Sequence, residues 1–413
     1  MMSGTAARHV VIAGAGIAGL TAALAFARRG FSVSLFERTK RLEVAGAGLQ
    51  LSPNATRVLR RLGVLSLLKN TAVRPEAVIL RDAASLCELS RVPLGDAAER
   101  RWGAPYLVAH RADLQEALLT RVMLEPDIRI HLGAPVRNVK FHDGGATVTV
   151  EIEGRQEDIS CRLLVGADGV HSTVRTFGPS PAAPRFAGEN AWRATVSNES
   201  EAGRALMAAT TSNNVGAFLR PGFHLIAYPI SAGTAVNLVA FTKAVEGSSA
   251  SSADLPLRRE LARCASPLRG IIETKDSPEW TFWPIYTVDP GAPWVSPKGL
   301  ALIGDAAHAM TPYAAQGAAM AIEDAVTLAG HVAEKQGGLG PALSMWEETR
   351  RRRITAVARR AALNKLAWHA GGPVAFARDI VLRMRGGQRL ASDLDWLYGW
   401  VPEQCPRLEE LSR

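Results

Sequence analysis

Cysteine is scarce in this sequence, and its scarcity excludes several kinds of site. Only four cysteines occur among 413 residues, far apart, with no CxxC pair and no adjoining cluster of histidines. This spacing excludes a disulfide scaffold, a redox dithiol and a zinc site, and it indicates a reducing compartment such as the cytoplasm. The four residues are Cys87, Cys161, Cys264 and Cys405.

Long apolar runs are also missing, apart from one uncharged stretch at residues 10–27. Only that stretch approaches the length of a membrane-spanning helix or an export signal. Three regularly spaced glycines within it, and Arg28 and Arg29 directly after it, argue against both interpretations. We therefore expect no association with a membrane.

Acidic residues are the minority charge, because 48 lysines and arginines outnumber 39 aspartates and glutamates and give a net charge of +9. Much of the excess lies between residues 350 and 389. A basic helix can bind nucleic acid. Alanines alternate with these arginines, however, and aromatic residues that stack on bases make up only 6% of the chain. We interpret the region as a solvated helix face that attracts anionic substrates, and we expect no nucleic-acid partner.

Residues 10–37 carry the strongest local pattern in the chain. An apolar strand leads into Gly14, Gly16 and Gly19 at GxGxxG spacing, and an alanine-rich helix and a second strand ending at Glu37 follow. In this context the glycines allow a tight turn, the approach of a pyrophosphate and close helix packing, while the helix N-terminus offers N–H groups to phosphates. The pattern predicts a βαβ dinucleotide-binding unit.

Two later predicted strands end in the same way. LLVGADG reaches Asp168, and LALIGD reaches Asp305 ahead of a helix predicted over residues 317–332. Ligands of α/β sheets bind at the carboxyl ends of strands, so one ligand that touches all three junctions must be long. The simpler alternative is that Asp168 and Asp305 cap the helices that follow them.

The middle of the chain changes character. Residues 186–282 hold alternating segments that predict an antiparallel sheet, with one helix near residues 255–264. Within this region PGFHLIAYPI places His224 and Tyr228 four residues apart, on one face if the stretch is a strand. Beyond residue 340 the apolar spacing predicts mainly helices.

Four motifs together resemble those of a known family. They are GAGIAG from Gly14 with Glu37, HRADL from His110, GADGVHSTVR from Gly166, and GDAAHAMTPYAAQGAAMAIEDA from Gly304. In these motifs the chain is similar to the single-component FAD-dependent aromatic hydroxylases with the para-hydroxybenzoate hydroxylase fold. It looks closest to the salicylate hydroxylase and 3-hydroxybenzoate 6-hydroxylase branch, and the resemblance covers residues 8–370.

The resemblance implies an α/β fold with discontinuous domains. A Rossmann-like FAD-binding domain with a parallel sheet would take residues 1–74, 101–182 and 285–340. A substrate domain with an antiparallel sheet would take residues 75–100 and 183–284. Residues 341–413 would form a C-terminal helical region.

The resemblance also implies which residues hold FAD. The GxGxxG loop would bind the pyrophosphate, Glu37 the adenosine ribose, Arg111 the phosphate and ribityl region, and Asp305 a ribityl hydroxyl. Backbone N–H groups of Gln316 and Gly317 would meet the flavin ring. The complete implied set is Gly14, Gly16, Ala18, Gly19, Glu37, Arg38, Gly48, Arg111, Asp168, Asp305, Gln316 and Gly317. NADH or NADPH would act as a transient reductant, in keeping with the absence of a second GxGxxG domain.

The implied activity is hydroxylation of a small aromatic, such as a hydroxybenzoate, a salicylate or an N-heteroaromatic acid, with O2 and NAD(P)H. Reduced flavin and oxygen form a hydroperoxide, and a phenol that has lost its proton accepts the electrophilic oxygen faster. The resemblance makes His224 the base and Tyr228 a hydrogen-bond donor or relay, and it places Pro312 over the flavin. Arg193 would either bind a substrate carboxylate or pair with an acid of the protein.

The sequence leaves alternatives open. The same fold supports an epoxidase or a tailoring oxygenase with a larger neutral substrate. A flavin-dependent reductase or halogenase is another, although the Trp-x-Trp-x-Ile-Pro signature of halogenases is absent. A non-enzymatic, basic nucleic-acid-binding protein is a third. Dimers are common in the family that the chain resembles, so a homodimer is open as well.

Overall fold

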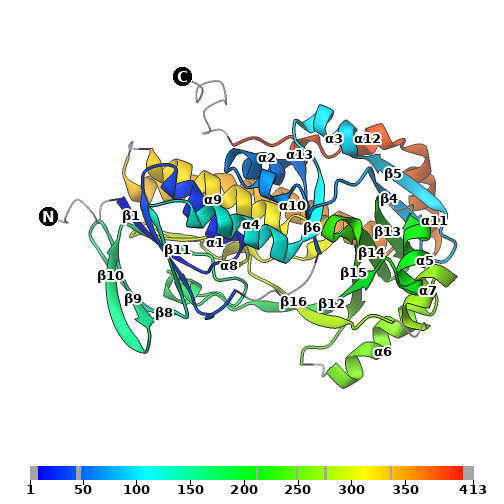
Figure 1. Cartoon of the computed structure of the whole chain (residues 1–413), viewed down its shortest axis with the longest axis horizontal. Coiled ribbons are helices and arrows are strands. Elements are labelled where there is room, and N and C mark those ends of the chain that lie inside the picture. Colours follow the sequence, from blue (N-terminus) through cyan, green and yellow to red (C-terminus); the bar gives the residue numbers. More distant parts are fainter. Residues whose placement is uncertain are drawn as a thin grey trace.

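The computed structural model describes residues 8–42, 48–210, 213–247, 250–273, 277–334 and 337–402. Cys405 and the two extreme ends of the expected domain ranges lie outside these residues. Two large sheets lie toward opposite ends of the molecule, and long strands and helices connect them (Figure 1).

One sheet is almost entirely parallel and lies at the left of Figure 1. Its strand order is β17-β18-β11-β1-β2-β7, and β17 alone is antiparallel to its neighbour. Its strands are β1 (His9–Ala13), β2 (Ser32–Glu37), β7 (Ile128–Leu132), β11 (Leu163–Gly166), β17 (Val295–Ser296) and β18 (Leu300–Leu302). Strands β18, β11 and β1 are neighbours and run parallel, so their carboxyl ends lie side by side. The three glycine junctions therefore meet at that end of the sheet, as we expect from the sequence.

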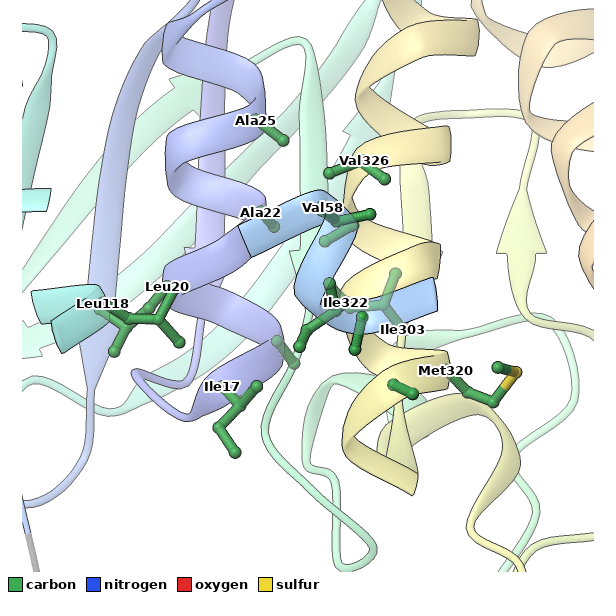
Figure 2. Close-up of a cluster of buried hydrophobic side chains, with 14 of the residues drawn as sticks. Ile17, Leu20, Ala22, Ala25, Val58, Leu118, Ile303, Met320, Ile322 and Val326 are labelled. Atoms are coloured by element: carbon green, nitrogen blue, oxygen red, sulfur yellow. The ribbon is translucent and has the colours of Figure 1, made fainter. Parts of the chain in front are cut away.

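Two helices pack against each other beside this sheet. Figure 2 shows α1 (Ile17–Ala27) next to α9 (Gly317–Ala333), with Ala25 directed toward Val326. Every residue of α1 except Ala18 is buried. A helix that is apolar on all sides belongs in a protein core or a bilayer, and here the core explains why the stretch lacks charge. Among the described residues, none of the helices combines the length and apolarity needed to cross a membrane.

The second sheet lies at the right of Figure 1 and has the order β16-β12-β15-β14-β13-β4-β5. Its strands are β4 (Ala77–Asp82), β5 (Glu88–Pro93), β12 (Arg185–Ser197), β13 (Val215–Arg220), β14 (Phe223–Ile230), β15 (Ala235–Lys243) and β16 (Thr281–Thr287). The prediction of an antiparallel sheet is correct except at β13 and β4, which run parallel. These two strands come from distant parts of the chain, so no tight turn obliges them to run in opposite directions.

Three helices cover one face of the second sheet. They are α5 (Glu201–Thr210), α6 (Ala250–Leu261) and α7 (Ser266–Glu273). The sequence pattern predicted only one helix in this region, near residues 255–264. Leu225 and Ala227 of β14 belong to the apolar cluster that lies beneath these helices. Because side chains alternate along a strand, His224, Ile226 and Tyr228 face the opposite side, toward the rest of the molecule.

The remaining elements connect the two sheets or cover their edges. The strands are β3 (Gly48–Leu51), β6 (Leu107–His110), β8 (Val136–His142), β9 (Gly145–Ile152) and β10 (Arg155–Cys161). The helices are α2 (Pro53–Arg61), α3 (Gly95–Trp102), α4 (Arg111–Met123), α8 (Asp305–His308), α10 (Leu339–Trp368), α11 (Gly372–Met384), α12 (Gly387–Ser392) and α13 (Asp395–Tyr398). Short 3-10 turns add η2 (Leu65–Leu68), η3 (Val174–Phe177), η4 (Ser231–Gly233) and η5 (Pro312–Ala314).

A buried charge cluster joins α9 to α10. Arg350 is 1% exposed, and its guanidinium donates to Asp324 Oδ1 and to Glu323 Oε2, each at 2.7 Å. His308 Nε2 lies 2.6 Å from Asp324 Oδ2, and Arg353 reaches Glu323 from the outer side at 2.9 Å. The prediction of a solvated basic face is therefore wrong for Arg350, whose charge lies in the core.

Burial alone would raise the pKa of Asp324. His308 and Arg350 outweigh this effect and lower the pKa of Asp324 to about 2. Asp324 is therefore ionised at neutral pH, and the buried guanidinium of Arg350 keeps a full countercharge. Such a pair is strongly destabilised when one partner is removed, because the other is left buried and uncompensated.

The end of the described chain packs against this cluster. Arg353 donates to the carbonyl of Leu397 at 2.8 Å, and Trp400 lies under the guanidinium groups of both Arg350 and Arg353. Arg101 binds Asp395 through two hydrogen bonds of 2.6 Å. The C-terminal segment therefore forms part of the core packing around α9 and α10.

Replacing Arg350 with alanine should lower the free energy of unfolding by about 3–5 kcal/mol, because it leaves Asp324 and Glu323 buried without their shared cation. Arg352→Ala is the matched control, since the Arg352 side chain is 79% exposed beside Glu348 and surface pairs contribute at most about 1 kcal/mol. Thermal unfolding of both variants measures the difference. Equal melting temperatures would contradict the structural role of the cluster.

Candidate active site

The glycine loop after β1 has a geometry that larger residues do not fit. Gly14 has φ of +102°, and a Cβ there would lie 2.5 Å from the carbonyl oxygen of Ala167. A Cβ on Gly19 would lie 1.8 Å from the oxygen of Gly14, so only glycine lets α1 pack onto the loop. A Cβ on Gly16 would meet nothing within 4 Å, which means that its backbone borders open space.

The N-terminus of α1 is open to a ligand. Gly16 is its N-cap, without a side-chain hydrogen bond, and no acidic residue lies in the first turn. The free N–H groups and the positive end of the helix dipole suit a phosphate. Glu37 ends β2 and accepts the backbone N–H of Ala15 at 2.9 Å and that of Thr39 at 3.0 Å. Its carboxylate thus ties the loop to the second strand.

The two aspartates behave differently. Asp168 accepts hydrogen bonds from the hydroxyl of Ser172 and from the N–H groups of Thr173 and Val174, so its carboxylate caps the turn that follows β11. Asp305 begins α8 and is exposed, and no hydrogen bond or ion pair engages its carboxylate within the described residues. Capping, the simpler alternative, therefore applies to Asp168. The carboxylate of Asp305 is left for a ligand.

Other expected cofactor residues lie near these junctions. A Cβ on Gly304 would lie 3.4 Å from Ala18, which places α1 beside the third junction. Arg38 is exposed just beyond β2. Gly48 packs so tightly that a Cβ would lie 2.6 Å from Asn237 and 2.7 Å from the ring of Tyr228. Gly48 therefore allows β3 to approach the second sheet.

A cavity of about 770 Å³ lies between the second sheet, β3, η5 and the helices α10 to α12. His224, Ile226 and Tyr228 all line it from β14, as the predicted strand alternation requires. Arg111 and Gly48 are also in its wall. Further lining residues include Gln50, Tyr106, Arg193, Pro312, Gly317 and Tyr398.

The N-terminus of α9 faces this cavity. Pro312 and Gly317 are exposed on its wall, and a Cβ on Gly317 would meet nothing within 4 Å. Gln316 is buried, and its amide donates to Ser52 Oγ at 2.9 Å and accepts from Asn54 at 3.2 Å. Its side chain is thus anchored in the core, which leaves the backbone of the first helical turn for a ligand in the cavity.

His224 is 1% exposed and surrounded by rings. It stacks on Phe241 with a centroid distance of 4.6 Å, and its Nδ1 lies 2.9 Å from Nε2 of His369. Burial, followed by the neighbouring His369, lowers the pKa of His224 well below its usual value. The imidazole is therefore neutral at physiological pH and can accept a proton.

Arg193 and Tyr228 contribute polar groups to the cavity wall, as do Gln50, Arg111, Arg360, Arg378, Arg385 and Asp393. Burial raises the pKa of Tyr228, which keeps its hydroxyl protonated, and Arg193 lies near enough to oppose this shift partly. The Nε of Arg193 is buried without a hydrogen-bond partner, and its guanidinium lies over the ring of Trp283 at 5.9 Å. Within the described residues no acid pairs with it.

Sequence reasoning missed several residues of the site. His369 at the end of α10 and Tyr398 in α13 lie outside every motif, and Tyr313 beside His224 lies within the fourth motif but received no role. Arg175 was noted only as part of a motif, yet it is 4% exposed and donates to the carbonyl oxygens of Val170, Ala182 and Ala306. Arg175 thereby joins the second junction to α8.

Comparison with known proteins decides what this arrangement is. A family model described as FAD binding domain matches residues 7–361. The chain belongs to this FAD-binding family. It is 34% identical over 392 residues to 3-amino-4-hydroxybenzoate 2-monooxygenase of Streptomyces cremeus, covering 95% of each chain. It is 29% identical to 3-hydroxybenzoate 6-hydroxylase of Polaromonas naphthalenivorans, covering 96% of this chain and 97% of that one.

Solved structures of the family share the fold. HpxO of Klebsiella pneumoniae, complexed with FAD and uric acid, has a TM-score of 0.80 at 24% identity, covering 95% of this chain and 96% of its own. A salicylate hydroxylase substrate complex has a TM-score of 0.76 at 22% identity, with the same coverage. The resemblance to FAD-dependent aromatic hydroxylases is therefore confirmed, and the protein is an FAD-dependent monooxygenase.

The residues of this chain fit FAD. The uncapped N-terminus of α1 can take phosphate, the free carboxylate of Asp305 can accept a hydroxyl, and the open backbone at Gly317 can meet a ring. These three features lie on α1, α8 and α9. Helix α1 follows β1, helix α8 follows β18 in the same sheet, and α9 is the next α-helix along the chain. An extended dinucleotide can reach all of them.

Substitutions at two glycines of the first loop should affect stability and FAD binding separately. Gly19→Ala should lower the stability of the flavin-free protein by roughly 1–3 kcal/mol, because its Cβ collides with the backbone of Gly14. Gly16→Ala should change that stability by less than about 1 kcal/mol but should weaken FAD binding about ten-fold. Thermal unfolding of flavin-free protein and fluorescence titration with FAD test both. A stable Gly19→Ala variant would contradict the packing argument.

Proposed function

We propose that the protein hydroxylates a small phenolic or N-heteroaromatic acid, such as a hydroxybenzoate or salicylate, with O2 and NADH or NADPH. The observation that carries the proposal is the grouping of a neutral histidine, a protonated tyrosine and an unpaired arginine on one cavity wall. A base, a hydrogen-bond donor and a cation are what a phenol with a carboxylate requires. The relatives named for hydroxybenzoates support the same substrate class.

Bound FAD supplies the electrophilic oxygen, and the residues of the chain prepare the ring that receives it. His224 accepts the proton of the substrate hydroxyl through Nε2, since Nδ1 is engaged by His369. Removing that proton makes the ring more electron-rich. Tyr228 stays protonated and donates a hydrogen bond to the phenolate oxygen.

Arg193 binds the substrate carboxylate in this proposal. Among the described residues, no acid lies within salt-bridge distance of its guanidinium, although Asp305 favours its charge from farther away. Its Nε also lacks a partner, so an incoming carboxylate would satisfy both charge and hydrogen bonding. Pro312 lines the same cavity and shapes the approach of the ring to the flavin.

The cofactor residues take the roles that their positions support. The GxGxxG loop with Ala18 would hold the pyrophosphate, Glu37 and Arg38 the adenosine end, and Arg111 and Asp305 the ribityl chain. Gly48, Gln316 and Gly317 would border the flavin, and Asp168 would act by shaping the second junction. NAD(P)H dependence and the free thiols of Cys87, Cys161 and Cys264 support a cytoplasmic location.

A larger, neutral aromatic substrate is the second candidate. The cavity extends from the polar wall to apolar residues of the C-terminal helices, among them Val381, Leu382 and Leu390. An engineered cavity of about 150 Å³ holds one benzene ring, so 770 Å³ is about five times the space that one small ring needs. A tailoring oxygenase would use this extra space.

A substrate screen separates the two candidates and tests Arg193. Aromatic acids and the matching neutral phenols are added to the FAD-loaded protein, and NAD(P)H oxidation and hydroxylated product are measured. Acids should be preferred, and Arg193→Gln should raise KM for acids about ten-fold or more while changing KM for neutral phenols little. If neutral substrates are preferred and Arg193→Gln affects both classes equally, the carboxylate role is wrong.

His224→Gln should slow hydroxylation by about 10²–10⁴-fold while FAD stays bound. The pKa of His224 is lowered, so its base form persists as the pH falls, and wild-type activity should drop only well below pH 6.5. His142→Gln, which changes an exposed histidine of β8, is the control. Rapid-reaction kinetics over a range of pH measure the step, and unchanged rates in His224→Gln would exclude it as the base.

A further inference from the structure

Two histidines from distant parts of the chain meet behind the cavity. His224 Nδ1 on β14 lies 2.9 Å from Nε2 of His369, which follows the last residue of α10. A hydrogen bond between two neutral imidazoles needs one donor and one acceptor. The pair therefore already has the geometry for passing a proton from one ring to the other.

The surroundings of His224 offer few other routes for a proton. The ring is 1% exposed and is enclosed by Phe241, Tyr313 and Trp368 at centroid distances of 4.6, 5.3 and 5.1 Å. When a substrate fills the cavity, it also covers the side of the ring that faces the reaction. A proton taken from that substrate must leave through Nδ1 or stay on a buried imidazole, where charge is unfavourable.

His369 differs from His224 in two respects. It is only partly buried, and it is not part of the cavity wall. Burial lowers the pKa of His369, Glu189 of β12 opposes this shift, and Lys365 of α10 and Lys243 of β15 add to it. A proton that arrives on His369 is therefore released again at neutral pH.

The other polar groups around the pair are occupied. Glu189 Oε2 accepts Lys365 Nζ at 2.7 Å, and Glu189 Oε1 accepts the hydroxyl of Tyr313 at 2.8 Å. Arg378 of α11 donates to the carbonyls of Ala367 and Trp368. Among the described residues, this leaves His369 as the group placed to take a proton from His224.

We propose that His369 is a positioning residue that acts through His224, receiving the proton that His224 takes from the substrate and releasing it to solvent. This inference rests on the proposed function. The phenol O–H bond breaks as a proton joins His224 Nε2, the proton on His224 Nδ1 moves to His369 Nε2, and the proton on His369 Nδ1 leaves to water. Both rings end neutral with exchanged tautomers, and the reverse transfer restores them when the product is protonated.

The test follows ionisation of a bound phenolic acid by its ultraviolet absorbance in a stopped-flow instrument, on FAD-loaded protein without reductant. His369→Gln keeps a hydrogen-bonding group but cannot relay a proton. We expect substrate affinity within about two-fold of wild type and ionisation at least about ten-fold slower, with a larger solvent deuterium effect. His331→Gln, a change at a buried histidine on α9 that donates to Thr327, is the matched control and should behave as wild type.

His369→Ala gives a second, independent readout. Added imidazole should restore its ionisation rate in proportion to concentration, which a purely structural role for His369 would not produce. If both variants ionise the phenol as fast as wild type, or if imidazole has no effect on a slow His369→Ala variant, the relay is wrong while the proposed function stands. If wild type itself does not ionise the bound phenol, the base role of His224 and the relay both fail, and the substrate screen alone decides the proposed function.

Discussion

The pairing of Arg350 with Asp324 and Glu323 is the interaction on which the rest of this structure depends. It places one cation and two anions from α10 and α9 in the core, where each is tolerated only because the others are present. Asp324 also accepts the N–H of Gly304 at 2.9 Å, and Glu323 accepts Asn54 at 2.7 Å. The cluster thereby fixes the third glycine junction directly and the start of α9 through Asn54 and Gln316.

Some residues of the site are held in place by hydrogen bonds within the core, and others are left exposed for a ligand. Gln316 is held by Ser52 and Asn54, and only its backbone and Gly317 remain for a ligand. Arg175 and Asp168 hold the second junction in the same way, through hydrogen bonds to backbone groups. Reactive side chains then project from the second sheet, whose other face is covered by α5 to α7. The residues held in the core set the geometry, and in the proposed function a few residues on β12 and β14 carry the chemistry.

Sequence patterns predicted the features that are determined by neighbouring residues in the chain. Gly14 to Glu37, the two later junctions and the alternation of His224 with Tyr228 all depend on residues close together in the chain. The parallel pairing of β13 with β4, the burial of Arg350 and the contact of His369 with His224 depend on partners far away. No periodicity encodes such contacts. Arg350 begins a run of four arginines, a pattern typical of a surface, and only the structure shows the acids that surround it.

The order of strands β18, β11 and β1 has a consequence for the newly made protein. In chain order these neighbours are β1 at residues 9–13, β11 at 163–166 and β18 at 300–302. The ribosome therefore completes β1 long before β18 is available. Contacts between such distant segments form slowly. About three hundred further residues must therefore be made after the glycine loop before all three junctions of the FAD site exist. All three junctions can hold FAD together only after synthesis has passed residue 305.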